Sequence, residues 1–226
     1  MKKLIKKIPG IGWLVIKMKR LLRPIKYENS EKYWTERYKS GGNSGQGSYD
    51  FLAEYKAEIL NDFALKNNVK SVIEFGSGDG NQLSYFKFET YKGYEVSPDA
   101  IEMCKVRYKN DSSRSFHSYD EYKKEHTDLT LSLDVVYCLT EDAVYNDYMT
   151  KLFECSNRFV IIYSSNHNVN DAQLPHMKHR KFTDWIAINR EDFEQVDFVK
   201  NKYADTVKPF VSDFYIFKRK SVSDNG

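Results

Sequence analysis

Cysteine, proline and long apolar runs are all scarce in this 226-residue sequence. The three cysteines, Cys104, Cys138 and Cys155, are widely spaced and form no C-x-x-C pair. Neither a disulfide framework nor a cysteine metal site is therefore expected. The longest apolar run near the N-terminus, residues 8–16, is shorter than the roughly 20 residues of a membrane span, and no small-residue cleavage site follows it. These absences predict a cytoplasmic protein with reduced thiols.

Acidic residues are absent from the first 26 positions, which hold nine lysines or arginines. The remaining 200 residues carry 26 basic and 32 acidic side chains, a net charge of −6, so no nucleic-acid partner is expected. Apolar residues recur at helical spacing from Leu4 to Leu22. Such a basic amphipathic arm lies on an anionic membrane surface, such as the inner face of the membrane, or packs on the domain or on a partner chain. The sequence leaves both alternatives open.

The glycine-rich loop of this chain lacks the third glycine of a dinucleotide site. Residues 71–80, SVIEFGSGDG, predict a buried strand that runs into a loop, and residues 81–88 would then continue as a helix. The dinucleotide pattern is G-x-G-x-x-G, but its last glycine is replaced here by Asn81. Glu74 and Asp79 flank the loop, and carboxylates repel a pyrophosphate. They suit a ligand with an ammonium and a sulfonium group, which favours S-adenosylmethionine (SAM).

A second strand is expected over residues 91–97. It contains Glu95, which lies about 20 residues beyond the loop, where a carboxylate can bind ribose hydroxyls. Pro98 is expected to begin a helix with Ser97 as its N-cap. A loop of the form E/D-x-G-x-G-x-G followed by this acid resembles the class I SAM-dependent methyltransferases, and the resemblance covers residues 69–165. It implies a Rossmann-like seven-stranded α/β sheet with helices on both faces, an antiparallel C-terminal hairpin and an N-terminal helical extension.

The remaining apolar runs fit the same fold. Further strands are expected over residues 114–119, 129–133, 158–164, 193–199 and 211–217. Helices are expected over residues 51–63 and 141–153, the second with Thr140 as its N-cap. The predicted organisation is an arm, a helical cap with a lid loop, a methyltransferase domain and a frayed tail, over residues 1–26, 27–66, 67–220 and 221–226.

The resemblance also implies the cofactor site. Tyr119 and Asp120 fall where this fold contacts the adenine, through stacking and through acceptance of its amino protons. Asp134 ends the fourth strand, and acids at such strand ends face the crevice. The residues expected to bind SAM in the domain are Glu74, Gly76, Ser77, Gly78, Asp79, Glu95, Val96, Ser97, Tyr119, Asp120 and Asp134.

Four glycines within residues 41–47 have the composition of a flexible lid. The order of aromatic and glycine residues before the SAM loop resembles methyltransferases that accompany bacterial capsule and O-antigen synthesis, in which this segment folds over SAM. That resemblance implies that Tyr33, Arg37 and Ser48 close on SAM. A disordered linker is the alternative. The residues expected on the acceptor side are Tyr38, Asn43, Ser44, Tyr137, His176, His179 and Arg180.

The polar segment 165–184 holds three of the five histidines. The spacing of His176 and His179 would suit a metal, but no Cys or acid completes the set, so no metal is expected. With Arg180 they favour an anion site, and a solvated basic turn is the alternative. For a sugar hydroxyl acceptor, the catalytic base would be Asp134, His176 or His179. A phosphate-type oxygen would need no base.

These features predict a SAM-dependent O-methyltransferase. The resemblance implies that its acceptor is a surface-polysaccharide building block, either with a phosphate, phosphoramidate or uronate group or with a sugar hydroxyl. Two alternatives are a non-catalytic SAM-binding module held at the membrane and an NAD(P)-dependent oxidoreductase. The missing third glycine argues against the second.

Overall fold

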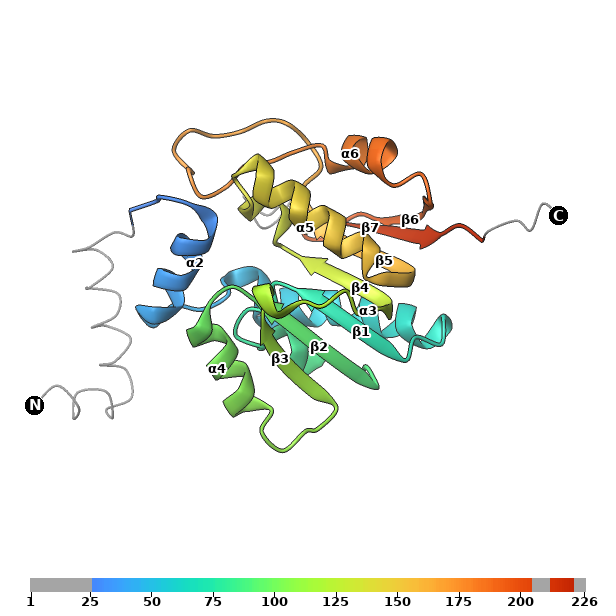
Figure 1. Ribbon diagram of the computed structural model, residues 1–226, viewed down its shortest axis with the longest axis horizontal. Helices are drawn as coiled ribbons and strands as arrows, with labels where there is room; N and C mark the ends of the chain where they lie inside the picture. Colours follow the sequence, from blue (N-terminus) through green and yellow to red (C-terminus); the bar gives the residue numbers. More distant parts are fainter. Residues whose placement is uncertain (1–25, 205–211, 222–226) are drawn as a thin grey trace, which may run out of the picture.

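The computed structural model of the chain describes residues 26–204 and 212–221 (Figure 1). The predicted arm, apart from Lys26, and nearly all of the predicted tail lie outside the described residues. The described residues contain a seven-stranded sheet in the order β3-β2-β1-β4-β5-β7-β6. This architecture confirms the predicted Rossmann-like methyltransferase sheet.

The strands lie within two residues of their predicted positions. Strands β1 to β5 run parallel, and β7 runs antiparallel to both β5 and β6. Val72 pairs with Leu129 in the centre of the sheet. The bounds are β1 Ser71–Phe75, β2 Thr90–Glu95, β3 Arg114–Ser118, β4 Thr127–Leu133, β5 Ser156–Ser164, β6 Phe193–Val199 and β7 Asp213–Arg219.

Helices cover both faces because successive strand residues point to opposite sides. On one face, Leu129 and Leu131 of β4 pack in a core with α3 and α4. On the other face, Val160 and Ile162 of β5 pack with α5 and α6. The α-helices are α2 Ser30–Lys39, α3 Asp50–Lys66, α4 Pro98–Arg107, α5 Asp142–Glu154 and α6 Phe182–Asn189, and the 3₁₀ turns are η2 Gln46–Ser48, η3 Gln82–Tyr85, η4 Tyr119–Glu121 and η5 Val136–Cys138. Within the described ranges, no helix is long and apolar enough to cross a membrane.

The helix expected over residues 81–88 is wrong, because only the short turn η3 forms there. The side chain of Asn61 on α3 donates to the Tyr85 carbonyl at 3.0 Å and accepts from the Lys87 amide at 2.8 Å. These bonds occupy backbone groups that a helix would need. The two following phenylalanines, Phe86 and Phe88, are instead buried in the core.

Thr140 is not the N-cap of α5. Glu141 holds that position, and its side chain makes no capping bond. The Thr140 hydroxyl bonds to Tyr27, and the Glu141 carboxylate accepts from the Ser30 amide at 2.8 Å and the Ser30 hydroxyl at 2.7 Å. The predicted capping region is therefore used to hold the start of α2. The predicted cap at Ser97 is confirmed, since its side chain accepts from the Ala100 amide.

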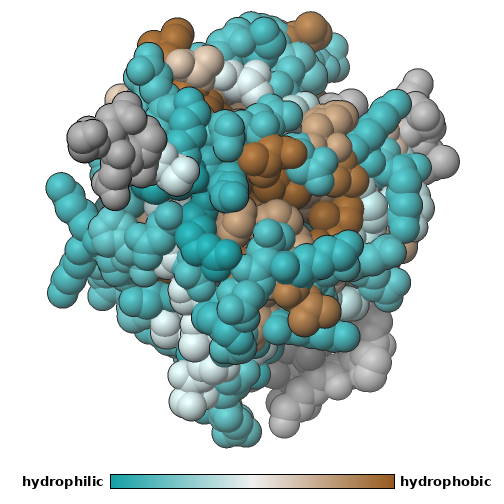
Figure 2. All heavy atoms as spheres, turned by 90° about the vertical axis from the view of Figure 1, so that its right-hand side faces the viewer, coloured by the Kyte–Doolittle hydropathy of each residue, from teal (hydrophilic) through white to brown (hydrophobic). Residues whose placement is uncertain are grey.

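The last strand in the sheet order, β6, forms an exposed edge. Figure 2 shows the side of the molecule on which β6 and β7 lie, with hydrophobic groups set among hydrophilic ones. Val196 and Phe198 of β6 are 47% and 45% exposed. Glu194 and Asp197 are also exposed on this strand, and charges on an edge strand oppose pairing with another chain.

The carboxyl ends of the parallel strands meet beneath α2. Figure 1 shows α2 beyond the tip of the β4 arrow. In open α/β sheets this edge is where ligands bind. The fold thus places the glycine loop, Glu95 and Asp134 at one end of the sheet, as the sequence predicts.

Candidate active site

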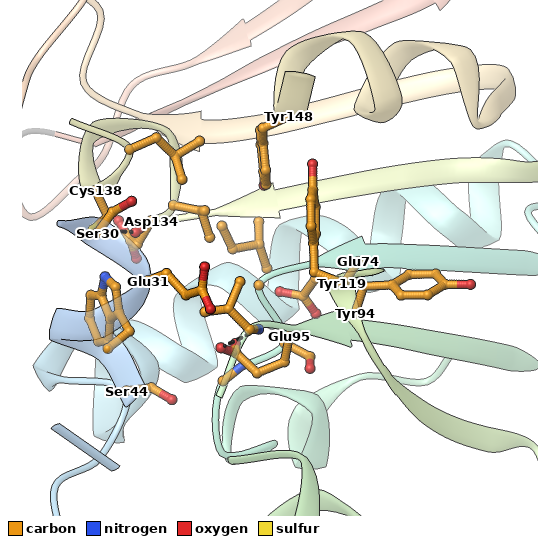
Figure 3. Close-up of a pocket in the computed structure, with 18 of the residues that line it drawn as sticks. Ser30, Glu31, Ser44, Glu74, Tyr94, Glu95, Tyr119, Asp134, Cys138 and Tyr148 are labelled. Carbon is orange, nitrogen blue, oxygen red and sulfur yellow. Dashed lines mark hydrogen bonds between the residues drawn. The ribbon is translucent and has the colours of Figure 1, made fainter. Parts of the chain in front are cut away.

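A first cavity of about 290 Å³ lies between α2 and the carboxyl ends of β1, β2 and β4. Figure 3 shows Glu74, Glu95 and Tyr119 on the strand side of the cavity, with Ser30 and Glu31 on α2 opposite. The predicted cofactor residues that line it are Ser48, Glu74, Gly76, Ser77, Gly78, Glu95, Val96, Tyr119, Asp120 and Asp134.

Two loop glycines have positive φ and leave no room for a side chain. Gly76 has φ +88°, and a Cβ there would lie 2.4 Å from Val135. Gly78 has φ +59°, and a Cβ there would lie 2.3 Å from the Ser44 hydroxyl. The lid therefore packs directly on the loop, which only glycine permits at this position.

The charge of the first cavity is uniformly acidic. Its described lining includes no lysine, arginine or histidine. Such a cavity attracts a cation and repels a pyrophosphate at short range. Its carboxyl groups belong to Glu31, Glu74, Glu95, Asp120, Asp134 and Asp147.

Glu74 is a buried carboxyl that accepts a hydrogen bond from the Tyr91 hydroxyl at 2.5 Å. Burial raises the pKa of Glu74 to about 7, against smaller opposing effects from Tyr91 and Lys56. This group therefore changes its charge near neutral pH. A cation bound in the cavity would favour its ionised form.

Glu95 turns its carboxylate back onto the glycine loop. One oxygen accepts from the Gly78 amide at 2.9 Å, and the other accepts from the amides of Val96 and Ser97 at 2.9 and 3.1 Å. Burial raises the pKa of Glu95, and these bonds oppose the rise. The carboxylate is held rigidly at the cavity wall, where its remaining lone pairs can accept from hydroxyls. Ser97 itself does not line the cavity.

Two buried polar atoms in this wall have no partner within the described chain. They are the Ser77 hydroxyl and the side-chain oxygen of Gln82. Both residues line the cavity. Buried polar groups are nearly always hydrogen-bonded, so these two fit a bound polar ligand. Gln82 was missed by the sequence analysis.

An aromatic wall closes the other end of the cavity. Tyr119 lies nearly parallel to Tyr148, with ring centroids 6.3 Å apart and an interplanar angle of 9°. The Tyr119 hydroxyl donates to Asp147 at 3.0 Å. Asp120 lies beside them in the lining. A flat base could lie against this wall, as predicted for the adenine.

Asp79 does not line the cavity, contrary to its predicted cofactor contact. It is fully buried and holds the lid instead. One oxygen accepts from the Ser44 amide at 2.9 Å and from the Tyr49 hydroxyl at 2.8 Å. The Ser44 hydroxyl accepts from the Asp79 amide at 3.0 Å and bonds to Tyr38 at 2.9 Å. The glycine-rich segment is therefore held against the glycine loop, which does not fit a disordered linker; that it acts as a lid stays a prediction.

A second cavity of about 320 Å³ adjoins the first, and Trp34, Ser44, Asp134 and Cys138 line both. The predicted residues that it brings together are Tyr33, Arg37, Ser44, Asp134, Tyr137, His176 and His179. Tyr33 and Arg37 thus lie at the second cavity and not at the first, where the resemblance had placed them. Tyr38 lines only the first cavity, and Asn43 lines neither.

Asp134 stands between the cavities with φ +60°. Its carboxylate accepts from Lys56 at 2.9 Å, Ser212 at 2.8 Å and Tyr137 at 3.1 Å. Lys56 is only 1% exposed and was missed by the sequence analysis, because a lysine on an amphipathic helix resembles a solvent-facing residue. Three donors occupy the Asp134 oxygens, which suits orientation of neighbouring groups better than proton abstraction.

The histidines of the second cavity are neutral near pH 7. Burial, followed by the charge of Arg37, lowers the pKa of His176. Burial, followed by His167, lowers the pKa of His179. The Nδ1 atom of His179 lies 2.6 Å from the Ser165 hydroxyl, and His176 stacks on Tyr33 with centroids 4.7 Å apart. A neutral imidazole suits a general base and does not by itself attract an anion.

Arg180 does not reach either cavity, although the sequence analysis placed it at the acceptor. Its guanidinium donates to the carbonyls of Leu139 and Thr140 at 2.6 and 3.1 Å. It also pairs with Asp142 at 2.7 Å and lies over the Tyr145 ring. These contacts fix the start of α5 and neutralise the charge that the anion prediction relied on. Within the described ranges, no cluster of three His, Cys, Asp or Glu residues could hold a metal ion.

No protein-family model matches the chain, and neither does any curated protein. Several solved structures, however, are similar to the chain. The N-methyltransferase NodS from Bradyrhizobium japonicum WM9, in complex with S-adenosyl-L-homocysteine (SAH), is 15% identical, with a TM-score of 0.65 over 86% of this chain and 100% of that one. Magnesium protoporphyrin IX methyltransferase from Synechocystis PCC 6803, with bound SAH, is 13% identical, with a TM-score of 0.62 over 84% and 98%.

The methyltransferase domain of bacterial CtHen1 is also similar, with 19% identity and a TM-score of 0.59 over 74% of this chain and 98% of that one. These proteins differ in what they act on, and their identities are low, so what they share with this chain is the architecture. The chain has the fold of the class I SAM-dependent methyltransferases.

Proposed function

We propose that this chain is a SAM-dependent O-methyltransferase. The observation that carries the proposal is the first cavity, which lies at the carboxyl ends of the strands and is lined by carboxyl groups without a cation among its described residues. Glu95 would hold ribose hydroxyls, and Tyr119 with Asp120 would hold the base. The unpartnered Ser77 and Gln82 atoms fit the same ligand. A dinucleotide would bring a pyrophosphate into this acidic lining, which disfavours the oxidoreductase alternative.

The second cavity is the proposed acceptor site. Bound SAM would supply an electrophilic methyl group on a sulfonium. In the transfer, the S–CH₃ bond breaks as the O–CH₃ bond forms, and a hydroxyl acceptor loses its proton. Neutral His179, oriented by Ser165, would take that proton. The closed lid would exclude water from the junction of the two cavities, where Asp134 and Trp34 lie.

The proposed acceptor is a building block of a surface polysaccharide of the capsule or O-antigen type, with an anionic group. The resemblance of the cap segment supports the glycan class. Tyr33, Trp34 and Tyr137 give the second cavity aromatic faces on which a sugar ring can lie. We also propose that the protein works in the cytoplasm and contacts the inner face of the membrane through residues 1–26, whose charge is wholly basic.

Calorimetry of the full chain with SAM, SAH and NADH tests the cofactor. SAM and SAH should bind without added metal, and NADH should not. If NADH binds and SAM does not, the proposal is overturned in favour of the oxidoreductase.

A methyl-transfer screen against nucleotide sugars, sugar phosphates and uronates tests the reaction. Turnover on any member, with a His179→Ala variant that retains SAM affinity but loses turnover, is the expected result. SAM binding without turnover on any acceptor would favour the non-catalytic module.

A further inference from the structure

A cation without a carboxylate partner remains in the second cavity. Arg37 lines this cavity and is half-buried. Its Nε donates to the Asn43 carbonyl at 2.7 Å, and its guanidinium carbon lies 5.3 Å from the centre of the Trp34 ring. Among the described residues, no Asp or Glu forms an ion pair with it. The two contacts fix the guanidinium in place while its terminal nitrogens stay available to a ligand.

The nearest acid in that cavity does not cancel this charge. Asp134 is paired with Lys56 at 2.9 Å, so its own charge is balanced from the other side. The positive charge of Arg37 also acts on its neighbours. After burial, it is the second cause that lowers the pKa of His176, and it opposes the rise in the pKa of Cys138 that burial produces. By contrast, Arg180 is paired with Asp142, and Lys181 with Asp184.

We infer that Arg37 forms an oxyanion subsite in the second cavity and binds the phosphate or carboxylate group of the acceptor. A guanidinium presents paired N–H donors that match such a group in a bidentate geometry. His176, stacked on Tyr33 beside it, forms the adjoining wall. This inference rests on the proposed function, and it moves the anion contact from the histidine–Arg180 cluster to the cap helix α2.

The subsite is tested on the full chain saturated with SAH, in a buffer without phosphate. Inorganic phosphate and glucuronate are the two probes, measured by calorimetry and by NMR titration of the His176 ring. Phosphate binding with no glucuronate binding identifies a phosphate subsite, and the reverse identifies a carboxylate subsite. The bound anion should raise the pKa of His176, because it offsets the Arg37 charge. If neither probe binds or shifts His176, the inference fails.

The decisive variant is Arg37→Gln, with Lys181→Gln as the matched loss of one nearby exposed cation. Arg37→Gln should weaken probe binding at least tenfold and abolish the His176 response, whereas Lys181→Gln should change neither. Arg37→Lys should give an intermediate affinity, because lysine keeps the positive charge but lacks the paired N–H donors of the guanidinium. If Arg37→Gln and Lys181→Gln weaken probe binding equally, the anions respond to the overall positive charge of the region, and Arg37 forms no specific subsite.

SAM affinity separates this inference from the proposed function. Arg37→Gln should leave it unchanged. A loss of SAM binding in this variant would assign Arg37 to the cofactor and overturn the subsite. If the wild-type chain itself fails to bind SAM, the proposed function fails, whatever the phosphate result.

Discussion

Lys56 projects its ammonium group into the interior from a helix whose other buried residues are mostly apolar. Its partner, Asp134, has a backbone conformation that disfavours most side chains. The two meet across 78 positions of sequence. No local pattern predicts such a pairing, because each residue on its own resembles a common surface residue. The role of Asp134 at the strand end was predictable, but the cation that holds it was not.

Lys56→Met should destabilise the protein by roughly 3 kcal/mol, because it leaves the partly buried carboxylate of Asp134 without its cation. Urea unfolding followed by circular dichroism measures the change. The same substitution in an Asp134→Asn background should cost clearly less. Equal costs in both backgrounds would show that the ion pair adds nothing to stability.

Glu74→Gln should remove a pH dependence from ligand affinity. The pKa of Glu74 is raised from 4.5 to about 7 in the folded protein. Between these two pH values the folded protein keeps a proton on Glu74 that the unfolded chain has lost. Stability from that proton is present at low pH and is lost as the pH rises through 7. A cationic ligand favours the ionised form, so its affinity should rise over the same range.

Calorimetry at pH 6 and pH 8 should therefore show the ratio of SAM to SAH affinity rising by up to about tenfold in the wild type. In Glu74→Gln the ratio should stay constant. A ratio that rises equally in both proteins would assign the titration to another group.

At the scale of elements, apolar runs and their order after the loop located the seven strands, with period-two alternation in the last two, and the glycine spacing located the loop. The failures have tertiary causes. The segment after the loop makes no helix because Asn61 captures its backbone. Arg37 faces the second cavity because α2 is tied to Glu141 at its start and to Asp79 through the lid. Contacts of this kind join elements far apart in sequence, so propensity cannot reveal them.

The lid should open more readily in Tyr49→Phe. This change removes the hydroxyl that donates to Asp79 at 2.8 Å, and a hydrogen bond to a charged group contributes about 1.5–3 kcal/mol. Hydrogen exchange of residues 41–49 should accelerate, and SAH should dissociate faster in stopped flow. Tyr85→Phe is the control, because within the described residues the Tyr85 hydroxyl makes no hydrogen bond to the lid. Unchanged exchange in Tyr49→Phe would mean that the other bonds of this segment, which involve Ser44 and the Ser48 carbonyl, hold the lid.

At the scale of the whole molecule, the described residues that line the two cavities begin at Ser30, after the basic arm. Deletion of residues 1–26 should therefore leave SAM binding within about twofold. It should also lower binding to anionic vesicles, because nine basic residues are lost. Vesicle sedimentation and calorimetry measure the two effects. A deletion variant that fails to fold would show that the arm packs on the domain.

Trp34 forms part of the wall of both cavities, so the two ligands of the protein share a boundary. Any shift of that boundary on binding one ligand changes the space left for the other. The two affinities are then linked, and thermodynamics makes the linkage reciprocal. If the bound cofactor changes the affinity for the acceptor by some factor, the bound acceptor changes the affinity for the cofactor by the same factor. Cooperativity between donor and acceptor would thus come from the few side chains, Trp34 among them, that line both cavities of a single chain.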